Sequence, residues 1–158
     1  MKTSDFNYDL PEKLIANYPL DQRSSSRLLV YKDQIDHKTF KDVIDYFEEG
    51  DLLVLNNTSV IPARVYGNKE SGGSVEVMLE RIMEDNRALV QIRSGRSPKI
   101  GTVIHLDKFK TECVDRQDNF FILQFDRSPL DVFNSIGHVP LPPYIKRPDE
   151  ELDKDRYA

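Results

Sequence analysis

The chain has 158 residues, with 22 Lys plus Arg against 27 Asp plus Glu and therefore a formal net charge of −5. Its 39% hydrophobic residues can form a core without disulfides or metal, which excludes a globally disordered or collagen-like protein. Its longest apolar runs, 52–55 and 120–123, fall short of the roughly 18 residues that a membrane span needs. Because Cys113 is the single cysteine and the N-terminus has no apolar signal segment, we expect a cytoplasmic protein with no membrane partner.

The first third of the chain predicts a mixed α/β arrangement. Residues 28–31 are a short apolar run followed by a polar turn, which is typical of a strand. A helix is predicted between Thr39 and Gly50. Thr39 is its N-cap, with Asp42 three residues later as in a capping box, and Gly50 follows its last turn. Residues 51–55 are nearly continuously apolar, which predicts a strand buried on both faces. The face of the helix is indicated by apolar residues at i, i+3, i+4 and i+7: Phe40, Val43, Ile44 and Phe47.

From residue 60 onward, short alternating segments separated by turn residues predict an antiparallel β-structure, and their small size favours a closed barrel. Cys113 falls in phase with apolar neighbours, so we expect it buried in a strand. Ser128 and Pro129 predict the start of a short helix that Gly137 ends, and the prolines of 140–145 require an extended segment. The predicted strands are 60–66, 74–81, 88–92, 102–106, 109–114 and 120–125.

The charges are unevenly distributed. Residues 87–110 carry six Lys and Arg against one Asp, a net of +5, whereas residues 149–155 carry five Asp and Glu against one Lys, a net of −4. Such runs are usually solvated segments, and we take this interpretation for both. Binding of a polyanion by the basic stretch is the alternative.

Three groups of polar residues have the chemistry of a binding site. Arg23 and Arg27 flank three serines, which suits a carboxylate or phosphate, although a surface loop explains them as well. Residues 56–58 follow the predicted buried strand, where ligands collect in α/β sheets; a turn in which the Asn side chains bond their own backbone is equally compatible. Arg64 is a charge within an apolar segment, and Tyr144 could stack on a base or fill a core. No metal-binding spacing is present.

Several segments, taken in order, resemble the bacterial S-adenosylmethionine:tRNA ribosyltransferase-isomerase family of queuosine biosynthesis. Among them are Leu-Leu-Val-Leu-Asn-Asn-Thr at 52–58, Ile-Pro-Ala-Arg at 61–64 and Gly-His-Val-Pro-Leu-Pro-Pro-Tyr-Ile at 137–145. The segments that carry the resemblance are 6–11, 14–16 with Pro19, Arg23 with 26–30, 50–58, 60–64 with Gly67, 72–77 and 137–145.

The resemblance implies a mainly β fold with an α/β portion, in which a small closed antiparallel β-barrel is inserted into an α/β domain that is only partly present. Residues 1–59 would be the N-terminal part of that domain, 60–138 the barrel with its short helix, and 139–158 an extended return segment. Family members continue with a second half that carries Gly-Leu-His-Phe-Thr. We therefore expect these 158 residues alone to be inactive, with the catalytic base unassigned.

The resemblance also implies a reaction. The family transfers and isomerises the ribosyl group of S-adenosylmethionine onto the aminomethyl group of the preQ1 base, 7-aminomethyl-7-deazaguanine, in the tRNA anticodon. The products are epoxyqueuosine-tRNA, adenine and methionine. S-adenosylmethionine is thus a co-substrate and preQ1-tRNA the partner, no metal is required, and we expect a monomer.

Site residues are proposed from the family's densest motifs. We expect Tyr144 and Arg147 to flank the substrate cleft. Arg93, Arg96 and Lys99 are candidate contacts to tRNA phosphates on the barrel. The alternative function is a non-catalytic nucleic-acid-binding β-barrel. The residues expected to line the cleft are Arg27, Asn56, Asn57, Thr58 and Arg64.

Overall fold

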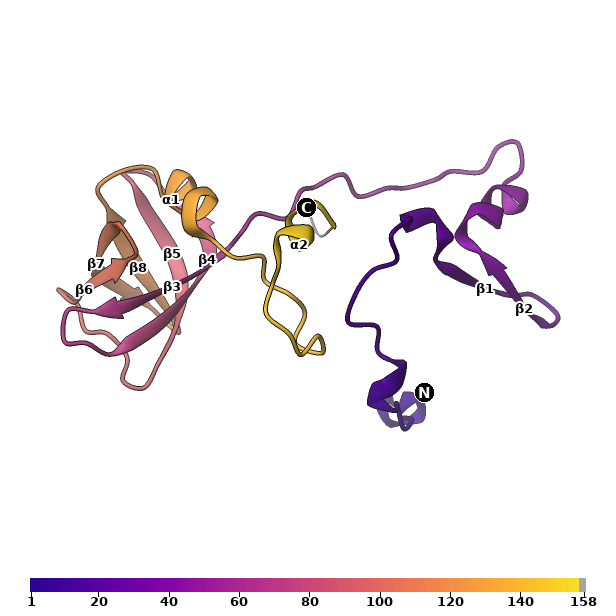
Figure 1. Ribbon diagram of the computed structural model, residues 1–158, viewed down its shortest axis with the longest axis horizontal. Coiled ribbons are helices and arrows are strands. Elements are labelled where there is room, and N and C mark those ends of the chain that lie inside the picture. The colour runs from indigo at the N-terminus through magenta and orange to yellow at the C-terminus, as the bar shows by residue number, and fades with distance from the viewer. Residues whose placement is uncertain (157–158) are drawn as a thin grey trace. The chain divides into compact units, whose positions relative to one another are not determined.

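The protein is described by a computed structural model that covers residues 1–156 (Figure 1). It divides into two compact units. The N-terminal unit consists of Met1–Thr58 and Pro143–Arg147, and the barrel unit of Ser59–Pro142 and the chain from Pro148 onward. The chain therefore enters the barrel unit, returns to the N-terminal unit at Pro143–Arg147, and re-enters the barrel unit at Pro148.

The barrel unit contains six antiparallel strands in the closed order β3-β4-β5-β8-β7-β6, with β6 pairing back to β3. This confirms the predicted mainly β fold with a closed barrel. Full closure leaves the sheet without an unpaired edge on which another chain could add a strand. The strands are β3 (Arg64–Lys69), β4 (Ser74–Ile82), β5 (Arg87–Ser94), β6 (Val103–Leu106), β7 (Phe109–Gln117) and β8 (Phe120–Phe125).

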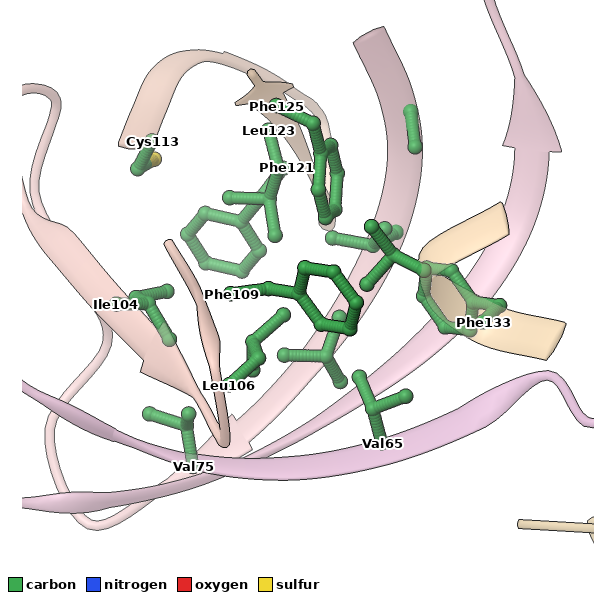
Figure 2. Packing of buried hydrophobic residues seen from close by; sticks show 14 residues of the cluster. Val65, Val75, Ile104, Leu106, Phe109, Cys113, Phe121, Leu123, Phe125 and Phe133 are labelled. Atoms are coloured by element: carbon green, nitrogen blue, oxygen red, sulfur yellow. The ribbon is translucent and has the colours of Figure 1, made fainter. Parts of the chain in front are cut away.

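The alternating apolar residues of these strands fill the interior of the barrel (Figure 2). Helix α1 (Pro129–Ile136) begins as predicted, with Ser128 Oγ accepting a hydrogen bond from the Asp131 N–H at 3.4 Å. It contributes Phe133, whose ring lies 6.4 Å from that of Phe125. Each fully buried apolar side chain stabilises the fold by about 1.5–3 kcal/mol. The core also includes Cys113, as predicted.

The N-terminal unit is built on the antiparallel hairpin of β1 (Arg27–Tyr31) and β2 (Ile35–Thr39). The helix predicted after Thr39 is present but is a 3-10 helix, η4 (Phe40–Tyr46), with the capping box between Thr39 and Asp42. Its predicted apolar face is largely exposed, because a two-stranded hairpin offers little surface to cover it. Three shorter 3-10 helices precede it: η1 (Thr3–Phe6), η2 (Glu12–Leu14) and η3 (Arg23–Ser25).

The strand predicted at residues 51–55 is wrong for this structure. Residues 51–63 form no helix or strand, and Leu52 and Val54 are 87% and 80% exposed. A buried strand needs neighbours to satisfy its backbone and layers to cover its side chains, and no described strand pairs with this segment. Likewise, β3 begins at Arg64 and not at residue 60, because Pro62 cannot donate a ladder hydrogen bond.

The acidic run near the C-terminus is more ordered than its charge indicates. It forms helix α2 (Glu151–Arg156), and Asp153 is fully buried there. The Glu150 N–H donates to Asp153 Oδ2 at 2.8 Å, at the start of the helix. The interpretation of this run as solvated holds for Glu150, Glu151, Lys154 and Asp155, which are exposed, but not for Asp153. No helix within residues 1–156 is long and apolar enough to cross a membrane.

Candidate functional site

The residues predicted to line a substrate cleft are divided between the two units. Arg64 belongs to the barrel unit, whereas Arg27, Asn56, Asn57, Thr58, Tyr144 and Arg147 belong to the N-terminal unit. Each unit therefore presents its own set of polar residues.

Arg27 lines a hollow of about 530 Å³ in the N-terminal unit, together with His37, Lys38, Thr39 and Asp42. The Thr39 N–H and Oγ1–H donate to Asp42 Oδ2 at 2.8 and 2.9 Å, which lowers the pKa of Asp42. Asp42 is thus committed to capping the helix. The cations of Arg27 and Lys38 give the hollow the chemistry of a site for a carboxylate or phosphate.

The serine-rich segment beside Arg27 lines a second hollow, of about 340 Å³, in the same unit. Arg23, Ser24, Ser26 and Phe40 surround it. The Ser26 hydroxyl donates to the Arg23 carbonyl at 2.9 Å, so it closes the turn of η3. Arg23 and Ser24 remain the groups that could contact a ligand there.

Asn56 and Thr58 contact each other. Asn56 Oδ1 accepts hydrogen bonds from the Thr58 N–H at 2.9 Å and from Thr58 Oγ1 at 2.7 Å. This is the local Asx turn that the sequence left open as the alternative to a binding role. Asn57, between them, is exposed.

Arg147 contacts Tyr18 and Asn17 within the N-terminal unit. Its guanidinium lies 4.2 Å from the centroid of the Tyr18 ring, and its Nε–H donates to the Asn17 carbonyl at 2.8 Å. The neighbouring Lys146 pairs with Glu12 and lowers the pKa of that carboxyl. Tyr144, in contrast, is 58% exposed. The return segment is therefore anchored by Lys146 and Arg147 and presents the Tyr144 ring to solvent.

The barrel unit contains a polar cluster that the sequence did not predict. Asp149 places both carboxylate oxygens 3.1 Å from His138 Nδ1, and one of them also accepts from the Val139 N–H at 3.2 Å. The His138 ring meets the Tyr66 ring edge-on, with centroids 5.2 Å apart. Arg64 Nε lies 3.1 Å from Glu76 Oε1, but without the alignment of a hydrogen bond. Arg64 and His138 exchange backbone hydrogen bonds at 3.2 and 2.7 Å, which joins these contacts into one cluster.

Gly137 determines where His138 lies. A Cβ added at Gly137 would lie 2.1 Å from the Pro62 carbonyl oxygen and 2.2 Å from that of Phe133. Only glycine allows this close approach, which aligns His138 with Arg64. The glycine directly before His138 was the one feature of the sequence that could have indicated this histidine. No local pattern indicated Asp149 as its partner.

An imidazole whose Nδ1 faces a carboxylate can present Nε2 as a proton acceptor. His138 and Asp149 also line a hollow of about 290 Å³ with Ser135, Glu150 and Lys154. The cluster can thus orient a ligand and take up a proton. Among residues 1–156, no group of three or more His, Cys, Asp or Glu is placed to hold a metal ion.

Of the predicted tRNA contacts, Arg93 lies near the end of β5, and Arg96 and Lys99 lie on the connection that follows it. Arg93 lines a hollow of about 470 Å³, and Arg96 lines a second one of about 440 Å³. Ser74 and Gly95 line both hollows, which are therefore adjacent. Lys99 lines neither; its N–H donates to Thr102 Oγ1 at 2.9 Å in the next turn. The structure thus groups Arg93 with Arg96 and separates Lys99.

The fold defines a mainly β protein with a closed six-stranded barrel between two parts of a second unit. The chain belongs to the queuosine biosynthesis protein family, whose family model matches residues 3–158. It is also similar to a crystal structure of S-adenosylmethionine tRNA ribosyltransferase from Thermotoga maritima, with 36% sequence identity over 84% of this chain and a TM-score of 0.44. The match covers 48% of that protein, so this chain spans about half the length of its relative.

Proposed function

We propose that the protein acts in queuosine biosynthesis as an S-adenosylmethionine-dependent tRNA ribosyltransferase. The observation that carries this proposal is the match of the family over residues 3–158, joined by 36% identity to a ribosyltransferase. In detail, the enzyme would transfer and isomerise the ribosyl group of S-adenosylmethionine onto preQ1 in tRNA. Epoxyqueuosine-tRNA, adenine and methionine would be the products, in the cytoplasm and from a monomer without a metal.

The two units offer different parts of this chemistry. The hollow at Arg27 and Lys38 suits the methionine carboxylate, because paired cations bind a carboxylate through charge-assisted hydrogen bonds. A sulfonium acidifies the adjacent ribose carbon, so the reaction needs a positioned base. In the barrel unit, His138 with Asp149 has the geometry of such a base. Arg93 and Arg96 are the proposed contacts to tRNA phosphates, and Lys99 is a further one.

We also propose that residues 1–59 and 139–158 are parts of one α/β domain, into which the barrel of residues 60–138 is inserted. The exposure of the apolar residues Leu52 and Val54 supports this proposal, because a run of this kind is normally covered by other strands. The same exposure supports inactivity of the 158 residues alone.

The test is adenine release from S-adenosylmethionine in the presence of preQ1-tRNA. It is measured for this chain alone and for a chimera in which the chain is joined to the part of the Thermotoga maritima protein outside the match. We expect release only from the chimera, and only when tRNA is present. A chimera that folds and binds tRNA but releases no adenine would contradict the enzyme and favour the binding barrel. Release by the chain alone at the rate of the Thermotoga maritima protein would contradict its inactivity.

A further inference from the structure

The turn between β3 and β4 and the connection after β5 meet at a hollow of about 440 Å³ in the barrel unit. We name this site the phosphate cradle and define it by the residues that line it. Two are cationic, two carry hydroxyls and two are glycines, which is the composition of sites that hold an anion between backbone and side chains. These residues are Lys69, Arg96, Ser71, Ser74, Gly73 and Gly95.

Lys69 is positioned by the loop opposite it. Its Nζ donates to the Arg96 carbonyl at 2.7 Å, and Ser94 Oγ donates to the same carbonyl at 2.7 Å. The side chain also crosses Gly73, where an added Cβ would lie 2.9 Å from Lys69 Cε. Because an ammonium has three N–H donors, two remain after the bond to Arg96. Lys69 is therefore held beside Arg96 and keeps two N–H donors that can bind an anion.

Arg93 extends the positive charge into the adjacent hollow. It faces Glu76 across the β4–β5 pair, but Glu76 already pairs with Arg64, with Nε and Oε1 3.1 Å apart. Glu76 lines the hollow of Arg93, where its charge is offset by Arg64. Glu70, in the turn between β3 and β4, lines neither hollow. The two hollows share Ser74 and Gly95, so successive anions could bind side by side.

We propose that the phosphate cradle, with Arg93 beside it, binds consecutive phosphodiester groups of an RNA backbone. The proposal rests on the proposed function for the choice of RNA, and it adds Lys69 and the two loops as the binding element. Two anion subsites in adjacent hollows favour a polymeric phosphate over a single free ion.

The experiment measures binding of a tRNA transcript to the 158-residue chain at several salt concentrations. Each phosphate contact contributes roughly 0.7–0.9 to the slope of log K against log salt. We expect Lys69→Gln and Arg96→Gln each to lower the slope by about one contact, and Lys69→Arg to preserve it. The matched controls are Lys110→Gln and Arg81→Gln, which remove the same charges outside the hollows. Arg81 is seven residues from Ser74 on β4, about 23 Å along the strand.

Gly73→Ala tests whether the position of Lys69 matters for binding or only its charge. The change removes no charge but displaces the Lys69 side chain. We expect it to weaken tRNA binding several-fold at fixed salt, with an unchanged unfolding midpoint. Equal slopes for the cradle and control variants, together with normal binding by Gly73→Ala, would overturn the cradle while leaving tRNA as the partner. If Lys69→Gln and Arg96→Gln weaken the binding of inorganic phosphate but leave the affinity and the salt slope for tRNA unchanged, the site is for a free phosphate ion and the RNA proposal is wrong. Absence of tRNA binding would also overturn the RNA proposal. The enzyme function is tested separately, by adenine release from the chimera.

Discussion

His138 and Asp149 are joined through His138 Nδ1, which lies 3.1 Å from each of the two Asp149 carboxylate oxygens. The pair connects the end of α1 to the segment that leads into α2. Since the Val139 N–H also donates to Asp149, this one carboxylate fixes both the ring and the backbone beside it.

Asp149→Asn should therefore loosen the polar cluster. An amide in place of the carboxylate loses the charge-assisted bonds, so we expect the free energy of unfolding of the barrel unit to fall by about 1–3 kcal/mol. Urea denaturation followed by far-UV circular dichroism measures this. Asp107→Asn, on the exposed turn between β6 and β7, is the control and should change little. Equal midpoints for the two variants would show that Asp149 has no such role.

His138→Gln should affect turnover more than tRNA binding. Because glutamine cannot act as a general base, we expect the chimera with this change to lose most of its kcat while its affinity for tRNA stays unchanged. His105→Gln, an exposed histidine on β6, is the control. A His138→Gln chimera with wild-type kcat would exclude the proposed base.

Gly137→Ala tests whether the close approach at the end of α1 is required. The added Cβ would contact two backbone carbonyl oxygens that cannot move independently. We expect a loss of about 1–3 kcal/mol in the free energy of unfolding, as for other overpacked sites. The same change at Gly95, where a Cβ meets nothing within 4 Å, should be nearly neutral. A neutral Gly137→Ala would mean that the approach is not fixed.

Cys113 makes the free energy of unfolding of the barrel unit fall at alkaline pH. Burial raises the pKa of the thiol, and the neighbouring charge of Asp115 adds to the effect. The folded state therefore binds this proton more tightly than the unfolded state. Its contribution is complete below the unfolded pKa near 9.0 and is lost as pH rises through the folded pKa. We expect the unfolding midpoint to fall above pH 9 in the wild type and to fall less in Cys113→Ala; parallel profiles would contradict this.

Asp42 has the opposite pH dependence in the N-terminal unit. The hydrogen bonds from Thr39 lower the pKa of its carboxyl below 3.8. The capping contribution is thus present above the unfolded pKa and is lost as pH falls through the folded pKa. Hydrogen exchange of the Thr39 amide should show protection at neutral pH that Asp42→Asn reduces, whereas Asp45→Asn on the same helix leaves it unchanged. Wild-type protection in Asp42→Asn would exclude the cap.

Local patterns predicted the parts of the fold that depend on neighbours in sequence. The alternation in segments such as 74–81 predicted the barrel strands, and the spacing of Thr39 and Asp42 predicted the capping box. The strand predicted from the apolar run at 52–55 was wrong because burial on both faces depends on neighbouring strands, which no local pattern supplies.

The candidate site shows the same limit. Arg93 and Arg96 were found because they share a basic stretch. The contact of Asp149 with His138 is made by a return of the chain over eleven residues. That of Lys69 with Arg96 joins the end of β3 to the connection after β5, 27 residues later. These pairings depend on the closed barrel and on the path of the return segment, so residue type and spacing could not predict them.

The most direct test of the proposed function measures transfer of the ribosyl group of S-adenosylmethionine to tRNA. S-adenosylmethionine labelled in its ribosyl carbons is incubated with preQ1-tRNA and the chimera, and label in the tRNA is compared with adenine released. The proposal predicts one labelled ribosyl group in tRNA for each adenine. Adenine release without label in the tRNA, or tRNA binding without either, would contradict it.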